Sequence, residues 1–347
     1  MITSLKEEKN IRKIRDLLDS VDKIVAITHT GPDGDAIGST TAFRSVMQRL
    51  GKTVNIIIPD MMLLSLRSVP GAKEVTDATR HPDFAKQLIE EAELIVCFDF
   101  NDLKRIGKLG ALVEKSSAPK ILIDHHENPG TFADVMISRP DISSTCFLLF
   151  RVLCALEMFD YIDKDAATSM LTGMMTDTGN FSYNCSDPEI YVVLAELIRK
   201  GADKEKIYKE QFATHSYDCL KLNSYAILNK MDVFSQYGCA VITLSRNELN
   251  QFHYTKGDTE GLVNRPLEIP GVEVSLFLRE EDGFVKASMR TTDRCRHANN
   301  ICNDLYGGGG HDKAAGGEFN GTLSECVEQF KLYMPEIKKK YFKESRI

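Results

Sequence analysis

The chain has 347 residues and a formal net charge of −7, with 43% hydrophobic and 27% charged residues. This length suggests two domains, and the composition is typical of an ordinary globular protein. An acidic chain is a poor candidate for binding long duplex DNA, which needs a wide Lys/Arg surface, although it can still bind a short phosphorylated substrate. We therefore predict no long duplex DNA among its partners.

The nine cysteines are scattered and form no C-x-x-C pair, a pattern typical of reduced thiols rather than disulfides or a zinc site. No stretch reaches the roughly 18 consecutive apolar residues of a membrane span. These two features predict a cytoplasmic protein with no membrane partner.

The first half of the chain alternates amphipathic helical segments with short β-rich runs. Apolar residues at positions 11, 14, 17, 18 and 21 lie on one helical face, and a second helix is expected from the loop after residue 28 to about residue 50. Alternation of this kind predicts right-handed crossovers and a parallel sheet. The expected strands are 23–28, 53–58, 93–98 and 120–123.

Three further helices are expected at 144–159, 164–175 and 188–200, which completes a catalytic domain over residues 1–200. A polar segment follows, and we predict a linker or hinge helix within 201–230. Residues 231–347 alternate like sheet strands at 238–244, 271–278 and 284–290, and a last helix is expected at 322–333. The fold class is therefore α/β, with an N-terminal parallel-sheet domain and a smaller C-terminal α/β domain with a mixed sheet.

Ionisable residues follow several apolar segments of the first domain. His29, Asp33 and Asp35 lie in the loop HTGPDGDAIGS, Asp99 follows 93–98, and the stretch ILIDHHENPG places Asp124, His125 and His126 after 120–123. Asp177 lies in a later loop, MMTDTGNFSYN. Because the carboxyl ends of parallel strands meet at one edge of the sheet, we expect these side chains to share one crevice.

Several carboxylates buried together raise one another's pKa, and divalent cations remove that repulsion. Histidine and carboxylate ligands without cysteine suit Mn²⁺, Fe²⁺ or Co²⁺, and Mg²⁺ is an alternative. The number of donors exceeds the needs of one ion. Two ions that share a carboxylate are typical of phosphoryl hydrolysis.

The same motifs resemble those of a known family. D-H-H at 124–126 is the signature of the DHH phosphoesterases, and HTGPDGDAIGS, CFDFND and TDTGNF occur in that family's order. GGGGHDKAAGG at 307–317 is similar to the glycine-rich motif of the DHH-associated C-terminal domain. The resemblance spans nearly the whole chain and is greatest to the bifunctional oligoribonuclease/pAp phosphatases, the NrnA-like subgroup.

This resemblance implies a role for each site residue. It implies two Mn²⁺ ions per subunit, with Mg²⁺ or Co²⁺ as alternatives, and Asp99 as the carboxylate that bridges them. Asp124 would orient a ligand histidine, and His126 would face the substrate phosphate, so these two are the predicted catalytic residues. The implied ligands are His29, Asp33 and Asp99 for one ion, and Asp35, Asp99, His125 and Asp177 for the other.

The glycine-rich segment has its own chemistry. Glycines permit positive φ and close backbone approach, and their N–H groups can surround an anion. Arg290 lies just upstream and can bind a phosphate through two hydrogen bonds. We therefore predict substrate binding by Arg290, Gly309, Gly310, His311 and, more weakly, Asn264.

The first functional hypothesis is a phosphohydrolase that degrades very short RNA to mononucleotides and removes the 3′-phosphate of 3′-phosphoadenosine 5′-phosphate (pAp). Alternatives are a phosphodiesterase for cyclic di-AMP or linear dinucleotides and, more remotely, a non-catalytic nucleotide-binding protein. The resemblance also suggests a homodimer. Related chains often carry a glutamate near the position of Phe147, whereas this chain is apolar there. The role of that position is therefore left open.

Overall fold

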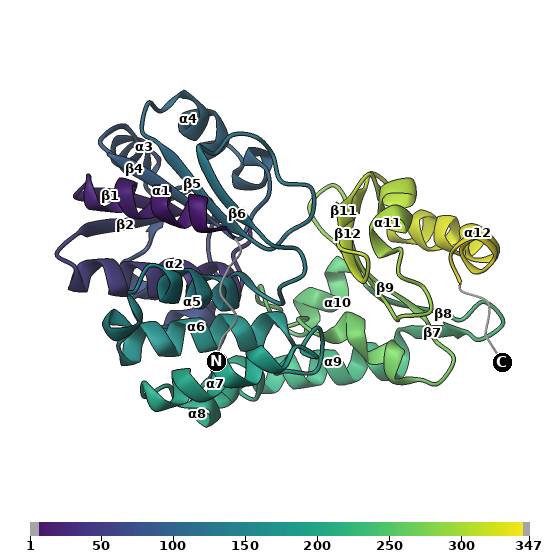
Figure 1. The fold of residues 1–347 in the computed structure, drawn as a ribbon. Coiled ribbons are helices and arrows are strands. Elements are labelled where there is room, and N and C mark those ends of the chain that lie inside the picture. Colours follow the sequence, from purple (N-terminus) through teal and green to yellow (C-terminus); the bar gives the residue numbers. More distant parts are fainter. Residues whose placement is uncertain (1–6, 343–347) are drawn as a thin grey trace. The chain divides into compact units, whose positions relative to one another are not determined.

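The computed structural model describes residues 7–342, so the ends of the two predicted domains, 1–6 and 343–347, lie outside it. The chain divides into two units, Met1–Thr214 and His215–Ile347 (Figure 1). The division falls within the segment 201–230 that the sequence predicts as a linker. This segment contains helices α8 (Lys204–Phe212) and α9 (Tyr217–Asn229).

Unit 1 is built on a six-stranded parallel sheet with the order β3-β2-β1-β4-β5-β6. The predicted parallel sheet is confirmed, and the four expected strands are β1, β2, β4 and β5. The prediction missed the two edge strands, β3 and β6, because two and four residues are too few for a clear periodicity. The strands are β1 (Lys23–Ile27), β2 (Thr53–Ile58), β3 (Thr76–Asp77), β4 (Leu94–Phe98), β5 (Lys120–Asp124) and β6 (Val135–Ser138).

The central strands are apolar throughout because helices cover both faces of the sheet. Successive residues of β1 enter two different cores: Ile24 and Ala26 pack on one face, and Val25 and Ile27 on the other. Helices α1, α2 and α5–α8 contribute to the first core, and α3 and α4 to the second. The remaining elements of unit 1 are α1 (Glu8–Asp19), α2 (Gly34–Arg49), α3 (Pro82–Glu90), α4 (Leu109–Lys115), α5 (Thr145–Ala155), α6 (Lys164–Asp177), α7 (Pro188–Arg199), and the 3₁₀ turns η1 (Leu64–Ser68), η2 (Ala72–Glu74), η3 (Leu103–Ile106) and η4 (Phe159–Tyr161).

Helices α2 and α6 approach each other closely because each has a glycine at the contact. A Cβ atom on Gly38 would lie 2.4 Å from the carbonyl oxygen of Ser169. A Cβ atom on Gly173 would lie 2.3 Å from Cys146 Sγ and 2.7 Å from Asp35 Oδ1. These glycines therefore allow α6 to pack directly against the start of α2, where Asp35 lies.

Phe147, the position that the resemblance left open, is a core residue. Its side chain is 0% exposed and belongs to the larger core of unit 1. The guanidinium carbon of Arg151 lies 5.8 Å from the centre of its ring. The apolar residue at this position is thus explained by packing.

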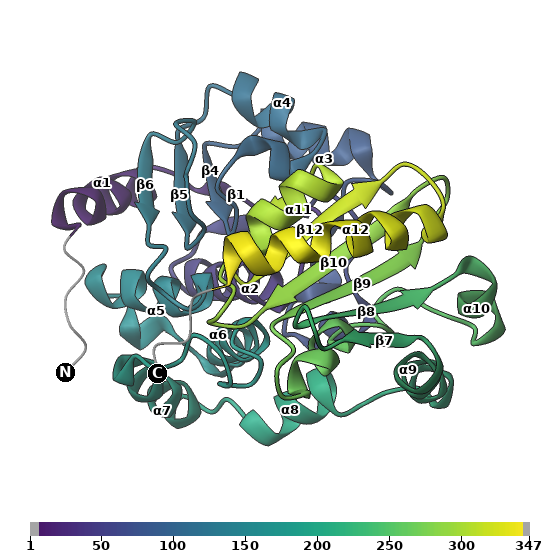
Figure 2. The same ribbon diagram turned by 90° about the vertical axis from the view of Figure 1, so that its right-hand side faces the viewer.

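Unit 2 contains the predicted mixed sheet, with the order β11-β12-β10-β9-β8-β7. Only β8 and β9 run parallel, and the other pairs are antiparallel. Its sheet packs against α11 and α12, which lie across the near face in Figure 2, while α9 contributes to a separate core. The elements are β7 (Met231–Phe234), β8 (Cys239–Leu244), α10 (Arg246–Gln251), η5 (Leu262–Glu268), β9 (Val274–Glu280), β10 (Val285–Thr291), α11 (Ala298–Tyr306), β11 (Gly309–Gly310), β12 (Ala314–Phe319) and α12 (Leu323–Tyr341).

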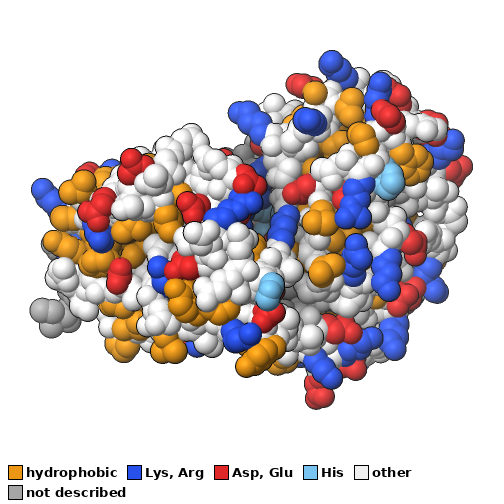
Figure 3. Space-filling model, turned by 180° about the vertical axis from the view of Figure 1, so that it is seen from behind, with side chains coloured by type: hydrophobic (Ala, Val, Ile, Leu, Met, Phe, Trp, Pro, Cys, Tyr) orange, Lys and Arg blue, Asp and Glu red, His pale blue; other side chains and the backbone are white. Residues whose placement is uncertain are grey.

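No helix among residues 7–342 combines the length and the apolar character that crossing a bilayer requires. On the face drawn in Figure 3, basic and acidic side chains are interspersed. This mixture matches the near balance of 43 Lys and Arg against 50 Asp and Glu in the whole chain.

Candidate metal centre

The loop after β1 positions three of the predicted site residues. Gly31 has a φ of 62°, which lets the chain turn sharply between His29 and α2. Asp33 caps α2, and its Oδ1 accepts hydrogen bonds from the backbone N–H groups of Asp35 and Ala36, both at 3.0 Å. This cap places Asp35 in the first helical turn, where the helix dipole favours a negative charge.

Asp99 lies between two imidazole rings just beyond the end of β4. Its Oδ2 is 3.4 Å from His29 Nε2, and its Oδ1 is 3.5 Å from His125 Nε2. The hydroxyl of Thr145 donates to the same Oδ1 at 3.0 Å. The Asp99 side chain is buried, and its φ of 64° is left-handed, a conformation that Asp tolerates better than most residues.

The D-H-H tripeptide distributes its three side chains differently. Asp124 ends β5, and its Oδ1 lies 2.8 Å from His126 Nδ1. His125 turns toward Asp177, the last residue of α6, with 3.3 Å between His125 Nε2 and Asp177 Oδ2. Asp124 therefore contacts and orients His126, whereas His125 faces Asp99 and Asp177.

Backbone carbonyl groups orient His29 and His125 instead. The Nδ1 of His29 is 2.9 Å from the carbonyl oxygen of Thr30, and the Nδ1 of His125 is 3.1 Å from that of Ile142. A carbonyl can only accept, so we assign the proton to Nδ1 in both rings. The Nε2 atoms then face the carboxylates, where a bound cation would replace the second ring proton and be ligated by Nε2.

Asp35 is fully buried and is held by the start of α5. Its Oδ2 accepts the Thr145 N–H at 2.6 Å, and its Oδ1 accepts the Cys146 N–H at 2.9 Å. Ser144 caps the same helix by accepting the Phe147 N–H at 3.1 Å. Ser144 and Thr145 thus have structural roles at this site.

The carboxyl groups perturb one another strongly. Burial raises the pKa of Asp35 to about 7, and the charge of Asp99 acts in the same direction. Burial also raises the pKa of Asp177 well above its ordinary value, although His125 opposes this. For Asp99 burial acts upward too, but its hydrogen bond with His29 and the histidine charges outweigh it, so the pKa of Asp99 is lowered.

The two histidines have raised pKa values because carboxylates surround them. Burial lowers the pKa of His29, but the hydrogen bond with Asp99 and the nearby carboxylate charges outweigh it and raise the pKa to about 9. Burial likewise acts against the charged form of His125, yet Asp177 and Asp99 raise its pKa to about 10. Without another cation, protons on these rings offset the carboxylate charge.

The donor atoms fall into overlapping groups that fit divalent cations. Nitrogen and carboxylate oxygen atoms lie within 4.8 Å of one another in each group, and Asp99 belongs to two of them. Within residues 7–342, Asp124 Oδ2 is buried without a hydrogen-bond partner, which adds an unused acceptor at the same edge. Mixed imidazole and carboxylate donors suit Mn²⁺, Fe²⁺ or Co²⁺. The groups are His29, Asp33 and Asp99; Asp35, His125 and Asp177; and Asp99, His125 and His126.

In unit 2 the sheet register brings two of the predicted binding residues together. Arg290 of β10 pairs with Ala314 of β12. Ala314 also exchanges backbone hydrogen bonds with His311, at 2.7 and 3.2 Å. Asn264 lies on η5, which packs against β9 and against β10, the strand that carries Arg290.

The glycine-rich segment forms a hairpin, β11 with β12, where the sequence had predicted an anion-binding loop. Gly309 and Gly310 are strand residues and are exposed. A Cβ atom on Gly308 would lie 1.9 Å from the carbonyl oxygen of Gly316, so close backbone packing alone requires a glycine there. The hairpin uses the His311 N–H internally, which removes one donor from the predicted anion site.

A parallel sheet with a D-H-H tripeptide at its carboxyl edge, followed by a mixed-sheet unit, defines a class of proteins. The DHH family N-terminal domain matches residues 23–174, and the DHHA1 domain matches residues 236–337. The chain belongs to the DHH family.

Three relatives are similar along nearly their whole length. An exopolyphosphatase-related protein from Bacteroides fragilis has 40% identity and a TM-score of 0.94, over 97% of this chain and 99% of that one. The bifunctional oligoribonuclease and PAP phosphatase NrnA of Thermus thermophilus is 29% identical over 92% of each chain. The protein of that name from Bacillus subtilis is 24% identical over 85% of this chain and 88% of its own.

Proposed function

We propose that the chain is a metal-dependent phosphohydrolase of short oligoribonucleotides and of pAp. The observation that carries this proposal is the position of Asp99 between His29 Nε2 and His125 Nε2, at 3.4 and 3.5 Å. A carboxylate in this place can bridge two cations, the arrangement suited to phosphoryl hydrolysis. The names of the NrnA relatives support the substrate class.

The proposed ligands are His29, Asp33 and Asp99 for one cation, and Asp35, Asp99, His125 and Asp177 for the other. Bound Mn²⁺, Mg²⁺ or Co²⁺ would supply a hydroxide from water and neutralise the phosphate.

Neighbouring groups of the chain hold the proposed ligands and His126 in position. The Thr145 and Cys146 N–H groups hold the Asp35 carboxylate, and the Thr145 hydroxyl holds Asp99, so these donors are fixed before substrate binds. Asp124 fixes His126 through the 2.8 Å contact with its Nδ1. We assign His126 Nε2 to the substrate phosphate, where a donor can stabilise negative charge as it develops.

In unit 2 we assign phosphate binding to Arg290 and His311, with Gly309, Gly310 and Asn264 as further contacts. Arginine matches phosphate geometry through two parallel hydrogen bonds. The homodimer and the cytoplasmic location stay predictions from the sequence.

The test is a product time course with Mn²⁺ on an RNA dinucleotide, a long RNA, pAp, cyclic di-AMP and pyrophosphate. We expect fast release of mononucleotides from the dinucleotide and of phosphate from pAp, with the long RNA cleaved poorly. Preference for cyclic di-AMP would instead favour the signalling phosphodiesterase. Turnover of none of them would refute the proposed substrates.

A matched pair of variants assigns any activity to the site. His125→Asn removes a proposed ligand, whereas His253→Asn changes a histidine whose side chain is 80% exposed. We expect the first variant to lose hydrolysis and the second to retain it. Equal activity of both variants would show that the proposed centre does not perform the reaction.

A further inference from the structure

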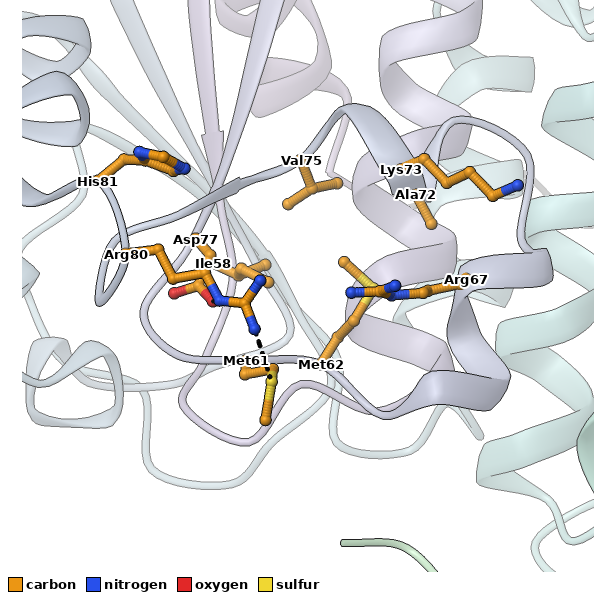
Figure 4. Close-up of a pocket in the computed structure, with 10 residues that line it drawn as sticks. All are labelled: Ile58, Met61, Met62, Arg67, Ala72, Lys73, Val75, Asp77, Arg80 and His81. Atoms are coloured by element: carbon orange, nitrogen blue, oxygen red, sulfur yellow. Dashed lines mark hydrogen bonds and ion pairs between the residues drawn. The ribbon is translucent and has the colours of Figure 1, made fainter. Parts of the chain in front are cut away.

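A cavity in unit 1 lies beyond the ends of β2 and β3, and its lining residues are separate from those assigned above. Its volume is about 340 Å³, within the range of small-molecule sites. The segment between β2 and α3 forms it, including η1 and η2 (Figure 4). It is lined by Ile58, Met61, Met62, Arg67, Ala72, Lys73, Val75, Asp77, Arg80 and His81.

The lining of this cavity carries excess positive charge. Asp77 is its single carboxylate, and Asp77 is already engaged by Arg80, with 3.5 Å between Nε and Oδ2, and by the hydroxyl of Thr79 at 2.6 Å. Arg67 and Lys73 have no ion pair or side-chain hydrogen bond with any residue in 7–342. Two uncompensated cations in an acidic protein favour an anionic ligand.

The same cavity also offers an apolar surface. In Figure 4, Met61 and Met62 lie among the side chains that line the cavity, and an Arg80 nitrogen lies 3.4 Å from Met61 Sδ. Methionine adapts to varied shapes, and guanidinium planes stack on nucleobases. The combination of cations with soft apolar side chains matches a nucleotide, which has both a phosphate and a base.

The cavity adjoins the candidate metal centre through the loop after β2. Asp60 Oδ1 accepts the Gly31 N–H at 2.5 Å, and Gly31 belongs to the loop that holds His29 and Asp33. In the sheet order β3-β2-β1-β4, the cavity lies at the same edge, one to two strands from β1. Neighbouring strands are about 4.8 Å apart, so the cavity is offset from the end of β1 by about 5–10 Å along the edge.

We propose that this cavity is a subsite for a nucleotide of the RNA substrate beyond the one that is released, with Arg67 and Lys73 binding its phosphate. The inference rests on the proposed function, because it requires a substrate with several phosphates. We place the subsite on the 3′ side of the scissile phosphate, where pAp carries no nucleotide, so pAp leaves it empty when its 3′-phosphate occupies the metal centre.

The test compares Arg67→Gln/Lys73→Gln with Lys13→Gln/Lys115→Gln. The second pair removes the same charge from exposed lysines of α1 and α4, which form no ion pair or side-chain hydrogen bond within residues 7–342. We expect kcat/KM for an RNA pentanucleotide to fall about tenfold in the first variant, with less than a twofold change for pAp. The control should change neither value by more than twofold.

A second readout does not depend on turnover. In EDTA, calorimetric titration of the pentanucleotide into the first variant should show weaker binding than wild type. The slope of log K against log salt should be smaller by about 0.7 for each phosphate that the variant no longer neutralises. If wild type is active and Arg67→Gln/Lys73→Gln shows unchanged kinetics and binding, the subsite is overturned. If wild type is inactive on all RNA, the proposed function is overturned instead.

Titration with AMP tests whether the phosphate bound by Arg67 and Lys73 belongs to the RNA substrate or to a free mononucleotide. Tight binding of AMP that is lost in Arg67→Gln/Lys73→Gln, with unchanged pentanucleotide kinetics, would show a site for free nucleotides and overturn the subsite. AMP binding equal in both proteins, together with the tenfold pentanucleotide effect, would support it.

Discussion

Asp99 combines a left-handed backbone with the central position among the donor atoms. Asp99→Asn keeps a residue type that accepts positive φ but removes the charge needed to bridge cations. We expect roughly a 10²–10³-fold loss of kcat for RNA dinucleotide hydrolysis with Mn²⁺, because stabilisation of the transition-state charge is lost. Steady-state product release measures this, and the thermal unfolding midpoint should confirm that the variant is folded. Full activity would contradict the bridging role.

Asp124 acts through His126 in our proposal, and the two side chains therefore should not contribute independently. Asp124→Asn leaves His126 Nδ1 without its carboxylate partner, so we expect about a 10–100-fold loss of kcat. His126→Ala should lose at least as much. The double variant should be little worse than His126→Ala alone, as a double-mutant cycle on kcat would show. Additive losses would mean that Asp124 acts on another group.

At the scale of elements, the contact between α2 and α6 depends on the absence of a side chain at Gly173. Gly173→Ala gains about 1 kcal/mol of helix propensity, but its methyl group overlaps Cys146 Sγ and Asp35 Oδ1. Overpacking of this kind costs about 1–3 kcal/mol, so after the gain in helix propensity we expect a net loss of up to about 2 kcal/mol in the free energy of unfolding. Urea denaturation measures it. Gly309→Ala is the matched control, because a Cβ atom there meets no atom within 4 Å; equal effects would refute the packing argument.

Glu248, in the first turn of α10, predicts that the stability of unit 2 depends on pH. Burial acts to raise the pKa of Glu248, but hydrogen bonds from the Ser245 backbone, Lys230 and Tyr225 outweigh it and lower the pKa from 4.5 to about 2. A carboxyl group with a lowered pKa stabilises the fold above its unfolded value, and this contribution is lost as the pH falls from about 4.5 toward 2. Glu248→Gln should therefore be less stable than wild type at pH 7, by about 1–2 kcal/mol.

The difference between these two proteins should shrink below about pH 4.5, because the unfolded wild-type chain then binds a proton at Glu248 that the folded state, with its pKa near 2, does not. Urea unfolding at pH 7, 5 and 3.5, followed by a probe in unit 2, tests this. Glu325→Gln is a suitable control, because that residue forms an equivalent capping box on α12 but is fully exposed. A constant difference across the pH range would contradict the role of the Glu248 charge.

Strand ends were predictable from the sequence, whereas the groups that orient the side chains were not. His29, Asp99 and Asp124 each follow an apolar strand, and that change of residue type is visible in the sequence. The carbonyl groups of Thr30 and Ile142 hold the imidazoles through backbone atoms, which leave no mark on residue type. The cavity beyond β2 was also missed, because its walls are 3₁₀ turns and irregular chain without periodicity.

For the whole molecule, the two units should respond differently to divalent cations. All three donor groups found within residues 7–342 lie in unit 1, and the cores of units 1 and 2 are separate. A ligand that binds only the folded state stabilises it by RT ln(1 + [L]/Kd), about 2.7 kcal/mol at 100 times Kd. Mn²⁺ should therefore slow hydrogen exchange in β1, β4 and β5, and leave β8, β9 and β10 unchanged.

Asp99→Asn separates specific binding from a general ionic effect in this experiment. In that variant the added protection of β1, β4 and β5 should disappear, because Asp99 belongs to two of the donor groups. Mass spectrometry of exchanged peptides resolves the two units in the intact chain, so neither has to be produced alone. Equal protection of both sheets by Mn²⁺, or protection of β1 that survives in Asp99→Asn, would show that the cation acts elsewhere. Protection confined to unit 1 and dependent on Asp99 would tie the stability of the parallel sheet to the cations that we propose for hydrolysis.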